Sequence, residues 1–176
     1  MSERSFKKEL LAPWTARDTA IAAIVGALYT VITMLIAPIA YGPLQIRLSE
    51  ALTVLPFDKK YGGRPAAVGA LVGVAIVTFG EPYAGIATWW GPISGVTGLL
   101  FVWWAGIYFK GSDFGKIVAC IFGVVNCVFF VGYLMLHLSF GVPLWAAIGG
   151  VALGEVVSLA ILGFILLKAL ERTHTR

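Results

Sequence analysis

The chain has 176 residues, of which 59% are hydrophobic and only 12% are charged, and its mean hydropathy is +0.90. A soluble domain carries about 25% charged residues, so this composition cannot cover a globule with polar groups and is typical of a protein embedded in lipid. The net charge of +4 does not indicate nucleic-acid binding, because no basic run would follow a phosphate backbone.

Six apolar segments follow one another along the chain, and we expect them to form one transmembrane domain that covers residues 1–176. The segments lie at about 17–37, 44–58, 64–80, 84–108, 116–137 and 143–168. A helix needs about 20 residues to cross the hydrocarbon core, and four of the segments reach that length easily. The second and third segments are shorter, so either could be tilted, broken or re-entrant.

The basic residues predict how the segments face the membrane. With six spans and a cytoplasmic N-terminus, 12 of the 13 Lys and Arg residues fall on the cytoplasmic side, and Arg47 is the exception. This distribution satisfies the positive-inside rule. We therefore expect an all-α integral membrane protein, a bundle of six transmembrane helices with cytoplasmic N- and C-termini.

Small residues repeat at helical spacing in several segments. The stripe in the first segment consists of Ala16, Ala20, Ala23, Ala27 and Thr30, and glycine pairs occur at Gly69/Gly73, Gly91/Gly95 and Gly150/Gly154. Small residues let helix backbones approach closely. We expect the glycine pairs to serve packing inside the bundle, whereas the alanine stripe fits internal packing and docking on another protein equally well.

Polar residues inside apolar segments are costly to bury, so they mark candidate substrate-binding residues. The candidates are Gln45, Arg47, Glu50, Asn126 and Glu155, with Tyr83, Trp89 and Trp90 at the same level of the bundle. Structural alternatives exist for most of them: Arg47 and Glu50 could neutralise each other, Asn126 could bond a neighbouring helix, and the tryptophans could be interfacial anchors. Glu155 has no basic residue nearby in its own segment, which favours a binding role.

Enzyme and metal motifs are missing from the sequence. A loose likeness to a phosphate-binding loop fails at Ile117, where Ser or Thr is required. His137 and His174 lack the spacing of a metal or triad site, and we expect Cys120 and Cys127 to be plain small hydrophobic residues. We therefore expect no enzymatic activity, no metal and no cofactor, and favour binding and passage of a small polar solute.

The block from Tyr41 to Pro56 resembles a known family. Its sequence, Tyr-Gly-Pro-Leu-Gln-Ile-Arg-Leu-Ser-Glu-Ala-Leu-Thr-Val-Leu-Pro, is similar to a block of the queuosine-precursor transporters. These are substrate-binding (S) components of energy-coupling factor (ECF) transporters. Asn126 and Glu155 extend the resemblance more loosely over most of the chain, whereas residues 79–92 and 58–64 depart from the family pattern.

The resemblance implies an S component in the cell membrane that captures deazaguanine bases such as preQ1 or queuine. Its partners would be a transmembrane coupling (T) subunit and two ATPase subunits that hydrolyse ATP. Ala23 and Ala27 match the Ala-x-x-x-Ala surface with which S components dock on the coupling subunit. The alternatives are an S component for another vitamin or heterocyclic base, a stand-alone carrier that uses Glu155 as its proton site, and a structural membrane subunit.

Overall fold

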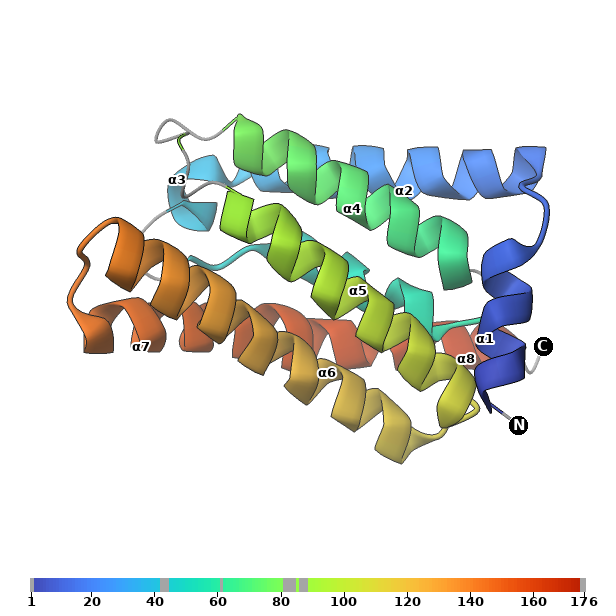
Figure 1. Ribbon diagram of the computed structural model, residues 1–176. Coiled ribbons are helices and arrows are strands. Elements are labelled where there is room, and N and C mark those ends of the chain that lie inside the picture. Colours follow the sequence, from blue (N-terminus) through green and yellow to red (C-terminus); the bar gives the residue numbers. More distant parts are fainter. Residues whose placement is uncertain (1, 42–44, 61, 81–84, 86–88, 175–176) are drawn as a thin grey trace.

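The computed structural model describes residues 2–41, 45–60, 62–80, 85 and 89–174, and the regular elements in these ranges are all helical (Figure 1). They are α1 (Ser2–Leu11), α2 (Ala16–Leu35), α3 (Ala37–Ala40), the 3₁₀ helix η1 (Leu48–Phe57), α4 (Gly63–Phe79), α5 (Trp90–Tyr108), α6 (Asp113–Cys127), the π-helix η3 (Val128–Ser139), α7 (Leu144–Glu155), the π-helix η4 (Val156–Gly163) and α8 (Phe164–His174). Each π-helix continues the α-helix before it without a break.

Among the described residues, four helical stretches are long and apolar enough to cross a membrane. They are Ala16–Leu35, Trp90–Tyr108, Asp113–Ser139 and Leu144–Thr173. Two shorter apolar helices, η1 and α4, complete the apolar part of the chain. The chain is therefore an all-helical membrane protein, while its six-span count and the side on which its termini lie remain predictions.

The long helices run lengthwise beside one another, and α1 lies crosswise at one end (Figure 1). This end also carries α8, so the first and last helices of the chain lie at the same end of the bundle. Phe6 on α1 packs against Trp103 of α5 with ring centroids 4.4 Å apart, and Trp103 Nε1 donates a hydrogen bond to Glu9 at 3.0 Å. These contacts hold α1 against the bundle.

Glycines set the close packing of α2, α4 and α5. A Cβ atom on Gly73 would lie 2.8 Å from Cβ of Tyr29 on α2, and a Cβ atom on Gly69 would lie even closer to the Ala22 carbonyl of the same helix. On α5, Gly91 and Gly95 face side chains of α4. The expected packing role of these two pairs is confirmed. The four alanines of the stripe lie exposed on the surface of α2: Ala16, Ala20, Ala23 and Ala27.

The second apolar segment is enclosed by the others. Its helix η1 contacts α2, α4, α5 and η4, which shield it from lipid. Ten residues of 3₁₀ helix rise about 20 Å, which is less than the hydrocarbon core of about 30 Å. An irregular stretch, residues 45–47, precedes it. The segment is thus a broken element in the centre of the bundle. A broken element is one of the three forms expected from the sequence for so short a segment.

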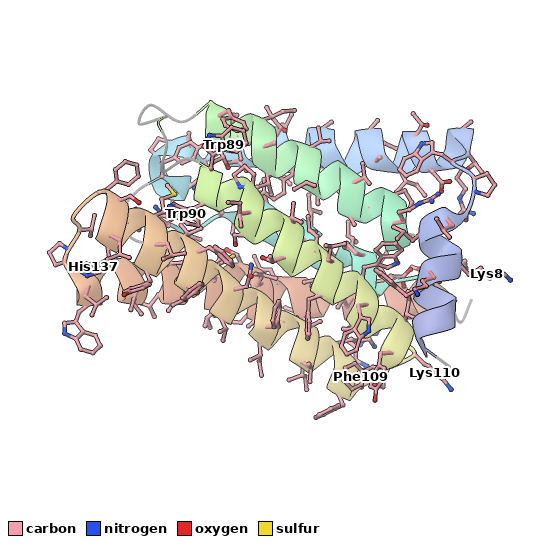
Figure 2. All side chains as sticks on the ribbon, viewed as in Figure 1. Lys8, Trp89, Trp90, Phe109, Lys110 and His137 are labelled. Atoms are coloured by element: carbon pink, nitrogen blue, oxygen red, sulfur yellow. The ribbon has the colours of Figure 1, made fainter. Side chains whose placement is uncertain are left out.

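Charged side chains gather at the end that carries α1. Arg17 donates to the Lys60 carbonyl at 3.0 Å, and Arg64 donates to the Ala12 carbonyl at 2.7 Å. Figure 2 shows Lys8 and Lys110 at this end, while Trp89, Trp90 and His137 lie toward the other. The bundle therefore has one basic end, as the distribution of Lys and Arg along the sequence predicts.

Candidate substrate-binding site

A cavity of about 40 Å³ lies among η1, α5, α6 and α7. Five of the residues predicted from the sequence line it together: Gln45, Arg47, Glu50, Asn126 and Glu155. Thr53, Ser94 and Cys127 add further polar groups, and glycines and aliphatic side chains form the remaining wall. The site thus brings distant parts of the sequence to one place: the irregular stretch before η1, η1 itself and the ends of α6 and α7.

Two buried carboxylates form the centre of this site. Oxygens of Glu50 and Glu155 and the Sγ atom of Cys127 all lie within 4.8 Å of one another. The hydroxyl of Tyr29 donates to Glu50 Oε1 at 2.5 Å, which fixes that carboxylate on η1. Arg47 interacts electrostatically with both acids. With both acids ionised, the two carboxylates and this guanidinium would carry one net negative charge, which favours binding of a further cation.

Glu155 has an unused acceptor. Its side chain is only 5% exposed, and among the described residues its Oε2 atom has no hydrogen-bond partner. Buried polar atoms are nearly always hydrogen-bonded, and leaving one unpaired costs about 1–3 kcal/mol. Glu155 is therefore prepared to accept a donor from a bound molecule.

Asn126 is fixed to α5 by its amide. Its Nδ2 atom donates to the Ser94 carbonyl and to Ser94 Oγ, both at 2.9 Å, and its Oδ1 atom accepts from Thr97 Oγ1 at 2.8 Å. Gly98 makes room for this contact, since a Cβ there would lie 3.2 Å from Nδ2. Asn126 thus bonds a neighbouring helix, the structural alternative for this residue, while its side chain also lines the cavity.

Comparison with known proteins identifies the family of the chain. The family model described as QueT transporter matches residues 19–172. The chain belongs to the QueT transporter family. This is the queuosine-precursor transporter family that the block from Tyr41 to Pro56 resembles, so that resemblance is confirmed. No curated protein and no solved structure gives a significant match. The QueT match includes every residue that lines the cavity and leaves α1 outside.

Two residues of the site coincide with a change of helix type. The chain passes from α- to π-helix directly after Cys127 and directly after Glu155. The π-helix is rare, and short π segments are frequent at functional sites of proteins. In this QueT family member both changes of helix type therefore fall at the cavity.

Trp89 and Trp90 are not among the described residues that line the cavity. Trp89 is 58% exposed and meets Phe79 edge-on with ring centroids 5.0 Å apart. Trp90 is half-buried, and its ring centroid is 6.3 Å from that of Phe130. Tyr83 lies outside the described residues. A contact of these three side chains with substrate stays a prediction.

Sequence reasoning predicted the neutral residues Gln45 and Asn126 but missed Tyr29 and Cys127. Tyr29 is fully buried and positions Glu50. In the sequence it is a single tyrosine in an apolar segment, and nothing there indicates a role in the site. Cys120 packs in the hydrophobic core, as expected, whereas Cys127 lines the cavity beside the acids. The only feature of the sequence that could have indicated Cys127 as a cavity residue is its position directly after the candidate Asn126.

The acid pair and Cys127 offer three atoms that could surround a cation. A metal ion and an organic ammonium group are both cations that carboxylates bind. The sequence-based expectation that the protein needs no metal therefore stays a prediction. What the arrangement can do chemically is to receive a positively charged donor group between two carboxylates.

Proposed function

We propose that the chain is the S component of an ECF-type importer and that it captures queuosine precursors, deazaguanine bases such as preQ1 or queuine, in this cavity. Its membership of the QueT transporter family supports the substrate class. The observation that carries the proposal is the buried, unpaired oxygen of Glu155 beside the carboxylate of Glu50. No group of the described protein uses this acceptor, so a substrate donor is its natural partner.

The chemistry of a deazaguanine base matches this arrangement. Its ring N–H and exocyclic amine are adjacent donors that one carboxylate accepts as a pair. An aminomethyl substituent is cationic, and the second carboxylate would balance its charge. Two carboxylates and the Arg47 guanidinium carry one net negative charge when ionised, which a singly protonated substrate neutralises.

Substrate entry requires the site to widen. A cavity of about 40 Å³ is far smaller than ligand pockets, which are typically about 300–1,000 Å³. The segment from Gln45 to Phe57 is the best candidate to move, because only its second part is helical and that part is a short 3₁₀ helix. We propose that displacement of this segment opens the cavity to the side opposite the basic end.

Energy would come from partner proteins. The exposed alanines Ala23 and Ala27 lie on α2, and residues of this helix that pack inward face α4 instead. This surface would dock on the T subunit, and two ATPase subunits would hydrolyse ATP at the cytoplasmic face. In this proposal the basic end is cytoplasmic, as the positive-inside rule requires, and the protein is a multi-pass component of the cell membrane.

A second candidate is a stand-alone proton-coupled carrier. The closeness of Glu50 and Glu155 favours it, because two buried carboxylates can share a proton. Uptake by the chain alone, without coupling partners and with a requirement for a proton gradient, would support this candidate. High-affinity binding without any uptake by the isolated chain supports the S component.

Calorimetric titration of the detergent-purified protein tests the proposal. We expect the parent to bind queuine or preQ1 without ATP, and Glu50→Gln and Glu155→Gln to bind about 10- to 150-fold more weakly, since hydrogen bonds to charged groups contribute about 1.5–3 kcal/mol. Glu9→Gln, a change in an acid on α1 far along the sequence from the site, is the matched control and should bind like the parent. Equal binding by both site variants and the parent would show that these carboxylates are structural. Binding of another heterocycle in place of both bases would make the substrate assignment wrong.

A further inference from the structure

A second, open pocket of about 300 Å³ lies at the basic end of the bundle. It is lined by the turn between η1 and α4, the turn between α5 and α6, and α8. Lys59, Lys60, Lys110 and Lys116 surround it, and the buried side chains of Phe57 and Leu167 contribute apolar surface. The pocket shares no residue with the substrate cavity.

The acids around this pocket are already neutralised. Glu171 Oε2 accepts hydrogen bonds from Lys116 Nζ at 2.8 Å and from Lys168 Nζ at 2.9 Å. Asp113 takes part in the same network, with an oxygen 2.9 Å from Lys116 Nζ. This network has two acids and two lysines and therefore no net charge.

A positive charge excess remains in the rest of the lining. It contains Lys59, Lys60 and Lys110 against the single acid Asp58, whose carboxylate accepts the backbone N–H of Lys60 at 2.9 Å. Lys59 also lies 3.8 Å from Glu9, but this pair is solvent-exposed and such pairs are weak. The pocket is thus suited to an anion.

An aromatic cluster of the kind found at membrane–water interfaces lies beside this pocket. Trp104 stacks on Tyr108, Tyr108 meets Phe109 edge-on, and in both pairs the ring centroids are 5.0 Å apart. Phe109 also contacts Phe114, which is 65% exposed, at 5.7 Å. Tyrosine and tryptophan concentrate at membrane–water interfaces. Figure 2 shows Phe109 beside Lys110, so the basic pocket and the aromatic cluster lie at one level.

We propose that this pocket binds the phosphate headgroup of an anionic phospholipid. Lysines bind phosphate as point charges, and basic pockets between transmembrane helices are suited to lipid phosphate groups. The apolar surface of Phe57 and Leu167 would contact the glycerol backbone, and the exposed rings beside Lys110 would contact the acyl chains. Lys110 has a left-handed backbone conformation with φ 49°, uncommon for a residue other than glycine, and the turn holds it at the pocket.

A pair of charge-matched variants tests this proposal in the full-length protein. Lys59→Gln/Lys110→Gln removes two lysines from the pocket, and Lys7→Gln/Lys8→Gln removes two exposed lysines from α1 at the same end. Native mass spectrometry from mixed micelles would measure how much phosphatidylglycerol and phosphatidylcholine each protein retains. We expect the parent and the α1 variant to prefer phosphatidylglycerol, and the pocket variant to bind it about 30-fold more weakly, since each lysine contributes about 1 kcal/mol.

Equal losses in the two variants would mean that bulk charge attracts the lipid and would overturn the proposal. Glycerol phosphate that binds the parent as tightly as phosphatidylglycerol would identify a site for free phosphate esters, and the lipid assignment would then be wrong. Circular dichroism verifies folding, and if the double variant is unfolded, Lys110→Gln alone replaces it with an expected loss of about fivefold. The test uses no nucleobase, so its outcome is independent of the proposed transport function.

Discussion

Individual side chains in the cavity depend on neighbouring residues for their positions. Gly98 is the clearest case, because its missing side chain lets Asn126 reach Ser94 with two hydrogen bonds of 2.9 Å. Tyr29 on α2 acts differently, since its hydroxyl donates a hydrogen bond to Glu50. The geometry of the site therefore rests on packing as much as on its charged groups.

Gly98→Ala tests this dependence. The added Cβ would lie 3.2 Å from Asn126 Nδ2, so the amide must shift by a few tenths of an ångström and its hydrogen bonds weaken. We expect substrate affinity to fall about 3- to 10-fold, since one hydrogen bond contributes about 0.5–1.5 kcal/mol. Gly149→Ala is the matched control, because a Cβ there meets nothing within 4 Å. Calorimetric titration of both variants with substrate measures the effect. Unchanged affinity in Gly98→Ala would show that the position of Asn126 does not matter for substrate binding.

The sequence predicted the charged members of the site and the neutral residues Gln45 and Asn126, but not Tyr29 or Cys127. Glu50 and Glu155 are conspicuous in the sequence because a charged side chain inside an apolar segment is energetically costly and therefore rare. Tyr29 and Cys127 are ordinary residues in membrane helices, and only the fold brings them beside the acids. Whether the acids contact a substrate remains a prediction.

Hydropathy located the apolar helices, since long apolar runs leave few alternatives in lipid, whereas the polar helix α1 was not predicted. The expected segment 116–137 corresponds to helix between Asp113 and Ser139, which begins earlier because Ser112 caps it by accepting the Gly115 N–H at 3.2 Å. No local pattern in the sequence indicates the 3₁₀ form of η1 or the π-helices.

The surface of α2 allows a test of coupling at the level of the element. Ala27→Trp adds bulk to an exposed position, while inward-facing residues of α2 such as Gly26 pack on α4. We expect uptake in cells to be lost, because the T subunit can no longer approach, and binding by the purified chain to stay within about twofold. Ile121→Trp on α6, which is 57% exposed, is the control and should leave both unchanged. Parallel loss of binding and uptake in Ala27→Trp would place the alanine stripe in the core of the fold.

The whole molecule is polarised along its length, with α1, α8 and the lysine-rich turns at one end (Figures 1 and 2). The sequence predicted this segregation because Lys and Arg occur almost exclusively in alternate connections. The membrane side that the basic end faces follows from the positive-inside rule rather than from the fold itself.

Sided labelling tests this orientation. In a background with Cys120→Ala and Cys127→Ala, a membrane-impermeant maleimide should modify Lys110→Cys only from the cytoplasmic side, because that turn lies at the basic end. Ser139→Cys, in an exposed position beside His137 at the other end, is the counterpart and should react only from outside. Reaction of Lys110→Cys from outside would reverse the proposed topology.

Native mass spectrometry of the protein with the ligand it retains during purification tests the central claim most directly. The proposal of a capture component for queuosine precursors predicts one bound molecule with the mass of a deazaguanine base, and loss of that molecule in Glu155→Gln. A different heterocycle at the same stoichiometry, or retention of the base by Glu155→Gln at the level of the parent, would contradict it.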